Sequence, residues 1–143
     1  MGDREMPPTY ENGQDIRERL FAFACRVVTF CRAVHAEGGV GRMMVLQLVN
    51  CSTAPAAMLE EARAAESRRD FVSKCSIALK ELRESLVRLR VMEACRIGSP
   101  TDARHLIGEA NELIAIVGAI VRNTKRNASL AAQARRPAGV PDS

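Results

Sequence analysis

A run of 27 residues from Glu66 to Met92 constrains the fold of this chain more than any other segment. It contains neither glycine nor proline, and its apolar residues recur every three or four positions between charged ones, which is the pattern of an α-helix with one buried face. Ser67 stands three residues before Asp70, so the serine can cap the first turn while the carboxylate lies at the positive end of the helix dipole. The run predicts a long amphipathic helix that packs against other elements.

Three further segments show helical periodicity, and together they predict an all-α, up-down four-helix bundle. The glycines at 38, 39 and 41 separate the first two segments, and Ser99 followed by Pro100 is a typical start for the last. Aromatic residues make up only 3% of the chain and tryptophan is absent, which favours helices over a sheet. The predicted helices are residues 14–36, 41–65, 68–97 and 100–127, between a flexible leader (1–13) and a disordered basic tail (128–143).

The second predicted helix carries no formal charge over the 17 residues between Arg42 and Glu60. A membrane span is disfavoured because Gln47, Asn50 and Pro55 interrupt a segment that is already short for one. Two interpretations remain open: the helix is central in a monomer, or it is buried on one side by its own bundle and on the other by a neighbouring copy. We favour the second. The candidate interface residues are Met44, Leu48, Pro55 and Leu59.

The reactive side chains indicate neither an enzyme nor a metal centre. The five cysteines, an odd number without C-x-x-C spacing, predict a reducing, cytoplasmic environment, and the first residues include no apolar signal segment. We expect the thiols to serve as small buried apolar groups. The two histidines, His35 and His105, have no partners at ligand spacing, and no serine stands in a triad pattern. We therefore expect no catalytic residue, cofactor or small-molecule substrate.

Positive charge is concentrated in two segments. Residues 67–98 carry eight basic and four acidic side chains, and residues 122–143 carry five and one, whereas the whole chain has a net charge of only +4. Such surfaces suit phosphate backbones, although an ordinary solvated face would have the same composition. The candidate nucleic-acid-binding residues are Arg68, Arg69, Arg122, Lys125 and Arg126.

Several segments resemble the four-helix bundle proteins first described from 23S ribosomal RNA intervening sequences. They are QL (47–48), the small-residue run at 51–57, EEA (60–62), SRRDF (67–71) and SIALKE (76–81), and the similarity covers about residues 15 to 126. Asn50 and Met58 stand where that family usually has arginine and asparagine. The resemblance implies a bundle that assembles as a homopentameric ring without established enzymatic activity. A related branch is the basic accessory protein of diversity-generating retroelements.

Two functions follow as hypotheses. The first is a non-enzymatic, self-assembling scaffold whose basic surface meets a protein or RNA partner. The second is a nucleic-acid-binding accessory subunit, as for a reverse transcriptase. Binding to RNA that weakens steeply with salt distinguishes the second from a scaffold that binds no nucleic acid.

Overall fold

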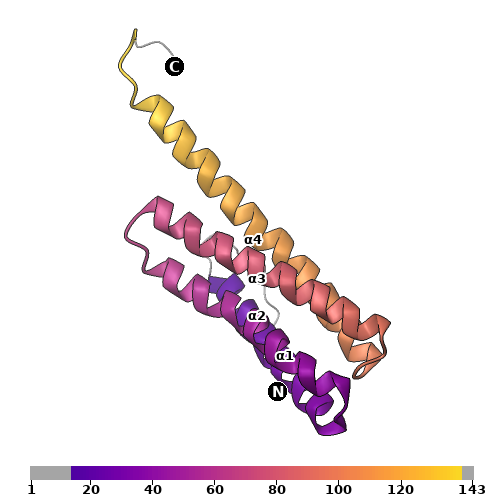
Figure 1. Ribbon diagram of the computed structural model, residues 1–143. Coiled ribbons are helices and arrows are strands. Elements are labelled where there is room, and N and C mark those ends of the chain that lie inside the picture. Colours follow the sequence, from indigo (N-terminus) through magenta and orange to yellow (C-terminus); the bar gives the residue numbers. More distant parts are fainter. Residues whose placement is uncertain (1–13, 140–143) are drawn as a thin grey trace, which may run out of the picture.

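The protein is a bundle of four α-helices joined by short turns (Figure 1). The computed structural model describes residues 14–139 and contains α1 (Gln14–Glu37), α2 (Val40–Arg63), α3 (Arg68–Ala94) and α4 (Pro100–Ala134), with no strand in this range. Each helix packs against the next, and α4 also packs against α1, which closes the bundle. The predicted all-α architecture of four consecutive helices is confirmed. The predicted leader at residues 1–13 lies outside the described range.

The end of α3 is set by backbone hydrogen bonding rather than by composition. The Arg96 N–H donates to the Glu93 carbonyl at 3.1 Å, and the Ile97 N–H donates to the Met92 carbonyl at 2.8 Å. This Schellman arrangement places Arg96 in the left-handed region, at φ 56°, where glycine is usual. The helix therefore ends at Ala94, three residues before the predicted boundary.

The last helix is longer than its periodic apolar face. We expected residues 128–143 to be disordered, but α4 continues to Ala134, so this expectation is wrong for residues 128–134. These residues include alanine, leucine and glutamine, which are strong helix formers, and the helix ends shortly before Pro137. As Figure 1 shows, α4 projects beyond the turn that joins α2 to α3. We call residues 128–134 the α4 extension.

One apolar core runs through the bundle, with a single polar pair inside it. Ser52 on α2 donates to the hydroxyl oxygen of Ser85 on α3 at 2.9 Å, and Ser85 donates to the Glu81 carbonyl at 3.0 Å. Both serines are fully buried, and the hydrogen bond between them links α2 to α3 inside the core. Each of the four helices contributes fully buried apolar side chains, among them Phe23, Leu48, Leu82, Leu89 and Leu113.

Gly41 allows the start of α2 to pack closely against the end of α1 and the turn between α3 and α4. A Cβ atom at this position would come within 2.7 Å of Val34 Cγ1 and 2.8 Å of Ile97 Cγ2. Gly108 is also helical, but a Cβ there would meet nothing within 4 Å. The two glycines therefore form a matched pair for testing the packing.

We expect Gly41→Ala to lower the free energy of unfolding by about 1–3 kcal/mol, because the added methyl group overpacks the contact with Val34 and Ile97. Gly108→Ala should raise it by up to about 1 kcal/mol, because alanine favours the helix and has free space. Urea unfolding followed by circular dichroism measures both. Equal effects of the two substitutions would contradict the packing described for α2.

Candidate nucleic-acid interface

The C-terminal half of α4 carries cations and no acidic residue. Between Glu112 and Asp142 the sequence contains five basic side chains and no carboxylate. Arg122, Lys125 and Arg126 are exposed, and within the described residues none of them has a carboxylate within 4.0 Å. Cations near the C-terminus of a helix also interact favourably with its dipole. This half of α4 is therefore a positive surface without internal neutralisation.

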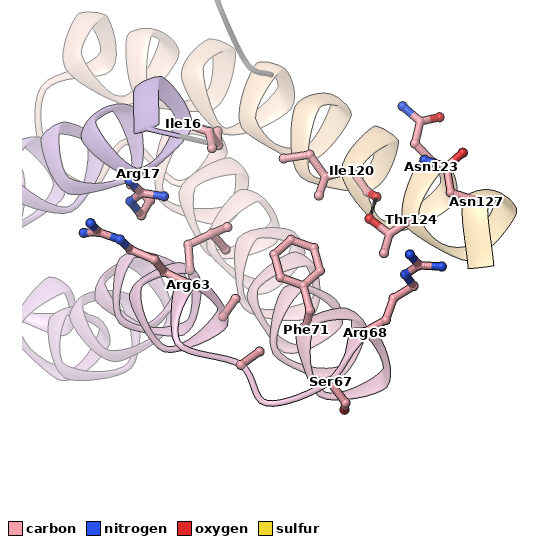
Figure 2. Close-up of a pocket in the computed structure, with 13 residues that line it drawn as sticks. Ile16, Arg17, Arg63, Ser67, Arg68, Phe71, Ile120, Asn123, Thr124 and Asn127 are labelled. Carbon is pink, nitrogen blue, oxygen red and sulfur yellow. Dashed lines mark hydrogen bonds between the residues drawn. The ribbon is translucent and has the colours of Figure 1, made fainter. Parts of the chain in front are cut away.

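The start of α3 lies beside this part of α4. Ser67 caps α3 by accepting a hydrogen bond from the Asp70 N–H at 3.0 Å, which fixes the direction of the first turn. Arg68 then lies next to Thr124 and Asn127 of α4 (Figure 2). Arg69 is exposed. The predicted basic residues thus belong to two segments that meet at one end of the bundle.

A pocket of about 760 Å³ opens at the same end. Its apolar floor includes Phe71 and Ile120, and three arginines from three different helices surround it. Figure 2 shows Arg17 and Arg63 on one side and Arg68 on the other, with the Phe71 ring between them. The polar wall is formed by α4. The lining residues from α4 are Ile120, Asn123, Thr124 and Asn127.

The arginines around this pocket are only weakly neutralised. Arg17 and Arg63 share one carboxylate, Glu60, at 3.8 and 3.6 Å, both longer than the 2.7–2.9 Å typical of a charge-assisted hydrogen bond. Arg68 has no carboxylate within 4.0 Å among the described residues. The Arg17 side chain is only 20% exposed, so its charge is held at the pocket rather than in bulk water. Three guanidinium groups and one carboxylate make the pocket electropositive.

Arg17 and Arg63 were not predicted from the sequence as site residues. They belong to helices whose ends are far apart in the sequence, and neither segment is basic overall. A usable signal was that both lie beside the apolar faces of their helices, near the ends that antiparallel packing brings together. Phe71 belongs to the SRRDF segment (67–71) that carries the family resemblance, but its position between arginines depends on the packing of α3 against α4.

Two of the three acidic residues on α4, Glu109 and Glu112, lie before its cationic half and are bound by an arginine of α1. Arg19 of α1 donates to Glu109 at 2.8 Å and to Glu112 at 2.7 Å. This arrangement ties α1 to α4 where the two helices meet. Glu109 and Glu112 therefore act as partners of one arginine, and neither of them forms an ion pair with Arg122, Lys125 or Arg126.

The predicted interface residues on α2 mostly face the core of their own bundle. Leu48 and Pro55 are fully buried and Leu59 is 5% exposed without any second copy present, while Met44 is half-buried. The prediction is therefore wrong for Leu48, Pro55 and Leu59, because the stripe that we assigned to a partner is the stripe that faces α1 and α3. Exposed apolar residues instead lie on the outer side of α2 and on α3. They are Val40, Met43 and Leu46 of α2, with Val87 and Val91 of α3.

The cysteines divide into two groups. Cys31, Cys51 and Cys75 are buried as expected, whereas Cys25 and Cys95 are exposed. Burial raises the pKa of the Cys31 thiol to about 11, with Cys51 adding to the shift, and burial raises the pKa of Cys75 to about 11 as well. These two thiols remain protonated and unreactive at neutral pH. In the described part of the chain, no group of three or more histidine, cysteine, aspartate and glutamate side chains is arranged to hold a metal ion.

Comparison with known proteins supports the fold. No protein-family model and no curated protein matches the chain. A crystal structure of a protein of unknown function from the S23 ribosomal protein family of Bacteroides thetaiotaomicron matches with a TM-score of 0.71 and 23% sequence identity, over 78% of this chain and 98% of that one. The two proteins share a fold.

This match agrees with the sequence resemblance to the proteins of 23S ribosomal RNA intervening sequences, which implied a four-helix bundle. The matched protein has no known function, so it brings no activity to this chain. None of the helices within residues 14–139 is long and apolar enough to cross a membrane.

Proposed function

We propose that the protein is a non-enzymatic, homo-oligomeric helical bundle that binds RNA through the C-terminal half of α4 and the start of α3. The observation that carries this proposal is the acid-free half of α4, where three basic residues and no carboxylate follow Glu112, with two more arginines directly after the helix. An ordinary solvated helix mixes both signs, because pairs of opposite charge four residues apart stabilise it. A helix surface of one sign favours a polyanion as its partner.

The geometry supports a backbone contact rather than recognition of a sequence. Arg122, Lys125 and Arg126 are exposed on one regular helix, and Arg68 and Arg69 come from the neighbouring helix. Side chains spaced along rigid helices present positive charge over a length that matches a series of phosphates. Such contacts fix position and affinity without selecting bases.

Assembly into a homo-oligomer is the second part of the proposal. We place the contact on the outer side of α2, and not on the stripe that was predicted from the sequence. Met43 is 81% exposed and Leu46 is 67% exposed on α2, and Val87 and Val91 are exposed on α3, where they share a hollow with Met44. We call Val40, Met43, Leu46, Val87 and Val91 the outer apolar face. A second copy is the proposed occupant, because α2 carries no charge between Arg42 and Glu60 and the proposed RNA surface on α4 lies elsewhere. The sequence resemblance implies five copies, and five is the number we expect.

We expect the full-length protein to bind a structured RNA of about 30 nucleotides with micromolar affinity at ~50 mM salt, and the affinity to fall steeply as salt rises. The triple variant Arg122→Gln, Lys125→Gln, Arg126→Gln should bind at least about tenfold more weakly. Its plot of log K against log salt should be less steep by about 2, since each lost phosphate contact removes ~0.7–0.9. Fluorescence anisotropy measures both quantities.

The matched control for this measurement removes three cations from another exposed surface. Arg26→Gln and Arg32→Gln lie on α1 and Arg104→Gln lies near the start of α4, all outside the proposed RNA interface and the outer apolar face. This variant should keep both the affinity and the salt slope of the unmodified protein. No RNA binding at ~50 mM salt, or equal loss in the two triple variants, would show that the C-terminal half of α4 is not an RNA surface.

We expect Met43→Glu combined with Leu46→Glu to reduce the oligomer to smaller species without unfolding it. Both side chains are exposed in a single copy, so a carboxylate at these positions is buried only when a second copy binds there. Leu130→Glu is the matched control, since Leu130 is also exposed, at 57%, but lies on the α4 extension. Light scattering coupled to size exclusion gives the masses. The proposal of assembly through α2 fails if the double variant keeps the mass of the unmodified protein, or if the unmodified protein is a monomer.

A further inference from the structure

We infer that the pocket at the end of the bundle binds one nucleoside phosphate, either as a free nucleotide or as an unstacked nucleotide of an RNA. A free nucleotide can bind here whether or not the protein binds RNA, so only binding of a nucleotide within an RNA rests on the proposed function. It concerns a cavity of about 760 Å³, which is within the range of small-ligand sites. The sequence analysis predicted no small-molecule site on this chain.

Three arginines line this one concave site. Arg17, Arg63 and Arg68 come from α1, α2 and α3, so their meeting at the pocket results from the fold and not from a local basic run. Figure 2 shows the guanidinium groups of Arg17 and Arg63 near each other on one side and that of Arg68 across the Phe71 ring. Bringing like charges together opposes folding, and Glu60 alone, at 3.6 and 3.8 Å from two of them, offsets the repulsion only partly. An anion between Arg17 and Arg63 would complete the site, and a phosphate matches the fork of the guanidinium group.

An aromatic ring lies beside these cations. The chain has only four phenylalanines and one tyrosine, and Phe71 lies in the pocket between Arg63 and Arg68 (Figure 2). Ile120 extends the apolar floor next to it. Unstacked bases bind proteins by stacking on such rings, and this contact tolerates any base. A phosphate on the arginines and a base on Phe71 use both parts of the pocket.

A pair of amides lies on the α4 side of the pocket. Asn123 and Asn127 line the pocket one helical turn apart. The Asn127 side chain has no hydrogen-bond partner within the described residues, and Asn123 accepts one from Arg126 at 3.4 Å. A carboxamide offers both donors and an acceptor, as the edge of a base requires. A fatty acid would place its apolar chain against this polar wall, so the amides favour a nucleotide over an anionic lipid.

The inference is tested by calorimetric titration of the full-length protein with AMP, GMP, CMP and UMP. We expect binding below about 1 mM, and at least about tenfold weaker binding of adenosine and of inorganic phosphate, because each fills only one part of the pocket. Phe71→Leu and Arg63→Gln should each weaken AMP binding about tenfold. Asn127→Ala, an exposed substitution that leaves the core intact, should also weaken it.

The controls are Arg90→Gln and Asn111→Ala, which remove the same side chains from exposed sites outside the pocket, and both should bind AMP as the unmodified protein does. Thermal melts separate loss of binding from loss of fold, particularly for Phe71→Leu. Absent binding of all four nucleotides, equal binding of inorganic phosphate and AMP, or displacement of AMP by oleate would each overturn the inference.

The two sources of the nucleotide are separated by competition. If AMP displaces RNA from the protein, the pocket takes a nucleotide of the RNA. If AMP binds and RNA does not, the pocket takes the free nucleotide and the proposed RNA function fails. If RNA binds through α4 while the nucleotide titrations are flat, the pocket inference fails and the proposed function stands.

Discussion

The unequal length of the four helices is the constraint on which the functional surface depends. Helix α4 has 35 residues, whereas α3 has 27 and α1 and α2 have 24 each. At ~1.5 Å per residue, the eight residues by which α4 exceeds α3 correspond to about 12 Å of helix that its neighbours cannot cover. An uncovered helix must be compatible with water on all sides, and alanine and other strong helix formers stabilise it there. This overhang carries no charged residue. Arg122, Lys125 and Arg126 lie in the turns just before it, and no acidic residue of α4 follows Glu112, so these three cations are available to an external anion.

The outer apolar face and the cations of α4 lie on different parts of the protein, and this arrangement connects assembly with binding. The outer apolar face lies on α2 and α3, where Lys80, Arg83 and Arg88 border it, while the cations of α4 and of the α3 start lie at one end of the bundle. In the proposed assembly, copies join through the outer apolar face and the cations of α4 stay outside the contact. Each added copy would then present the same basic end to one polyanion, which raises the overall affinity without any new contact.

The local features of the bundle were predictable, and the three-dimensional juxtapositions were not. Ser67 and Ser99 identified the starts of α3 and α4 because capping is a local interaction. The end of α3 was missed because Arg96 adopts a left-handed conformation that sequence usually assigns to glycine. The extent of α4 was missed because propensity continued the helix after the apolar periodicity had ended.

The site illustrates the same limit. Leu48 was assigned to an interface because a helix without charge has no polar face to mark its outer side, and the packing of α1 and α3 decided which stripe became the core. Arg17 and Arg63 belong to separate helices, so their meeting with Arg68 followed only from the closed bundle. The basic residues of α4, in contrast, form one continuous segment, and composition alone identified them.

Hydrogen exchange of the full-length protein with and without a structured RNA tests the central claim most directly, because it locates the contact on the chain. The acid-free half of α4 is the proposed RNA surface, so the amides of residues 120–134 should exchange more slowly in the presence of RNA, with little change over residues 43–50 of α2. Slower exchange confined to α2, with α4 unaltered, would contradict this account.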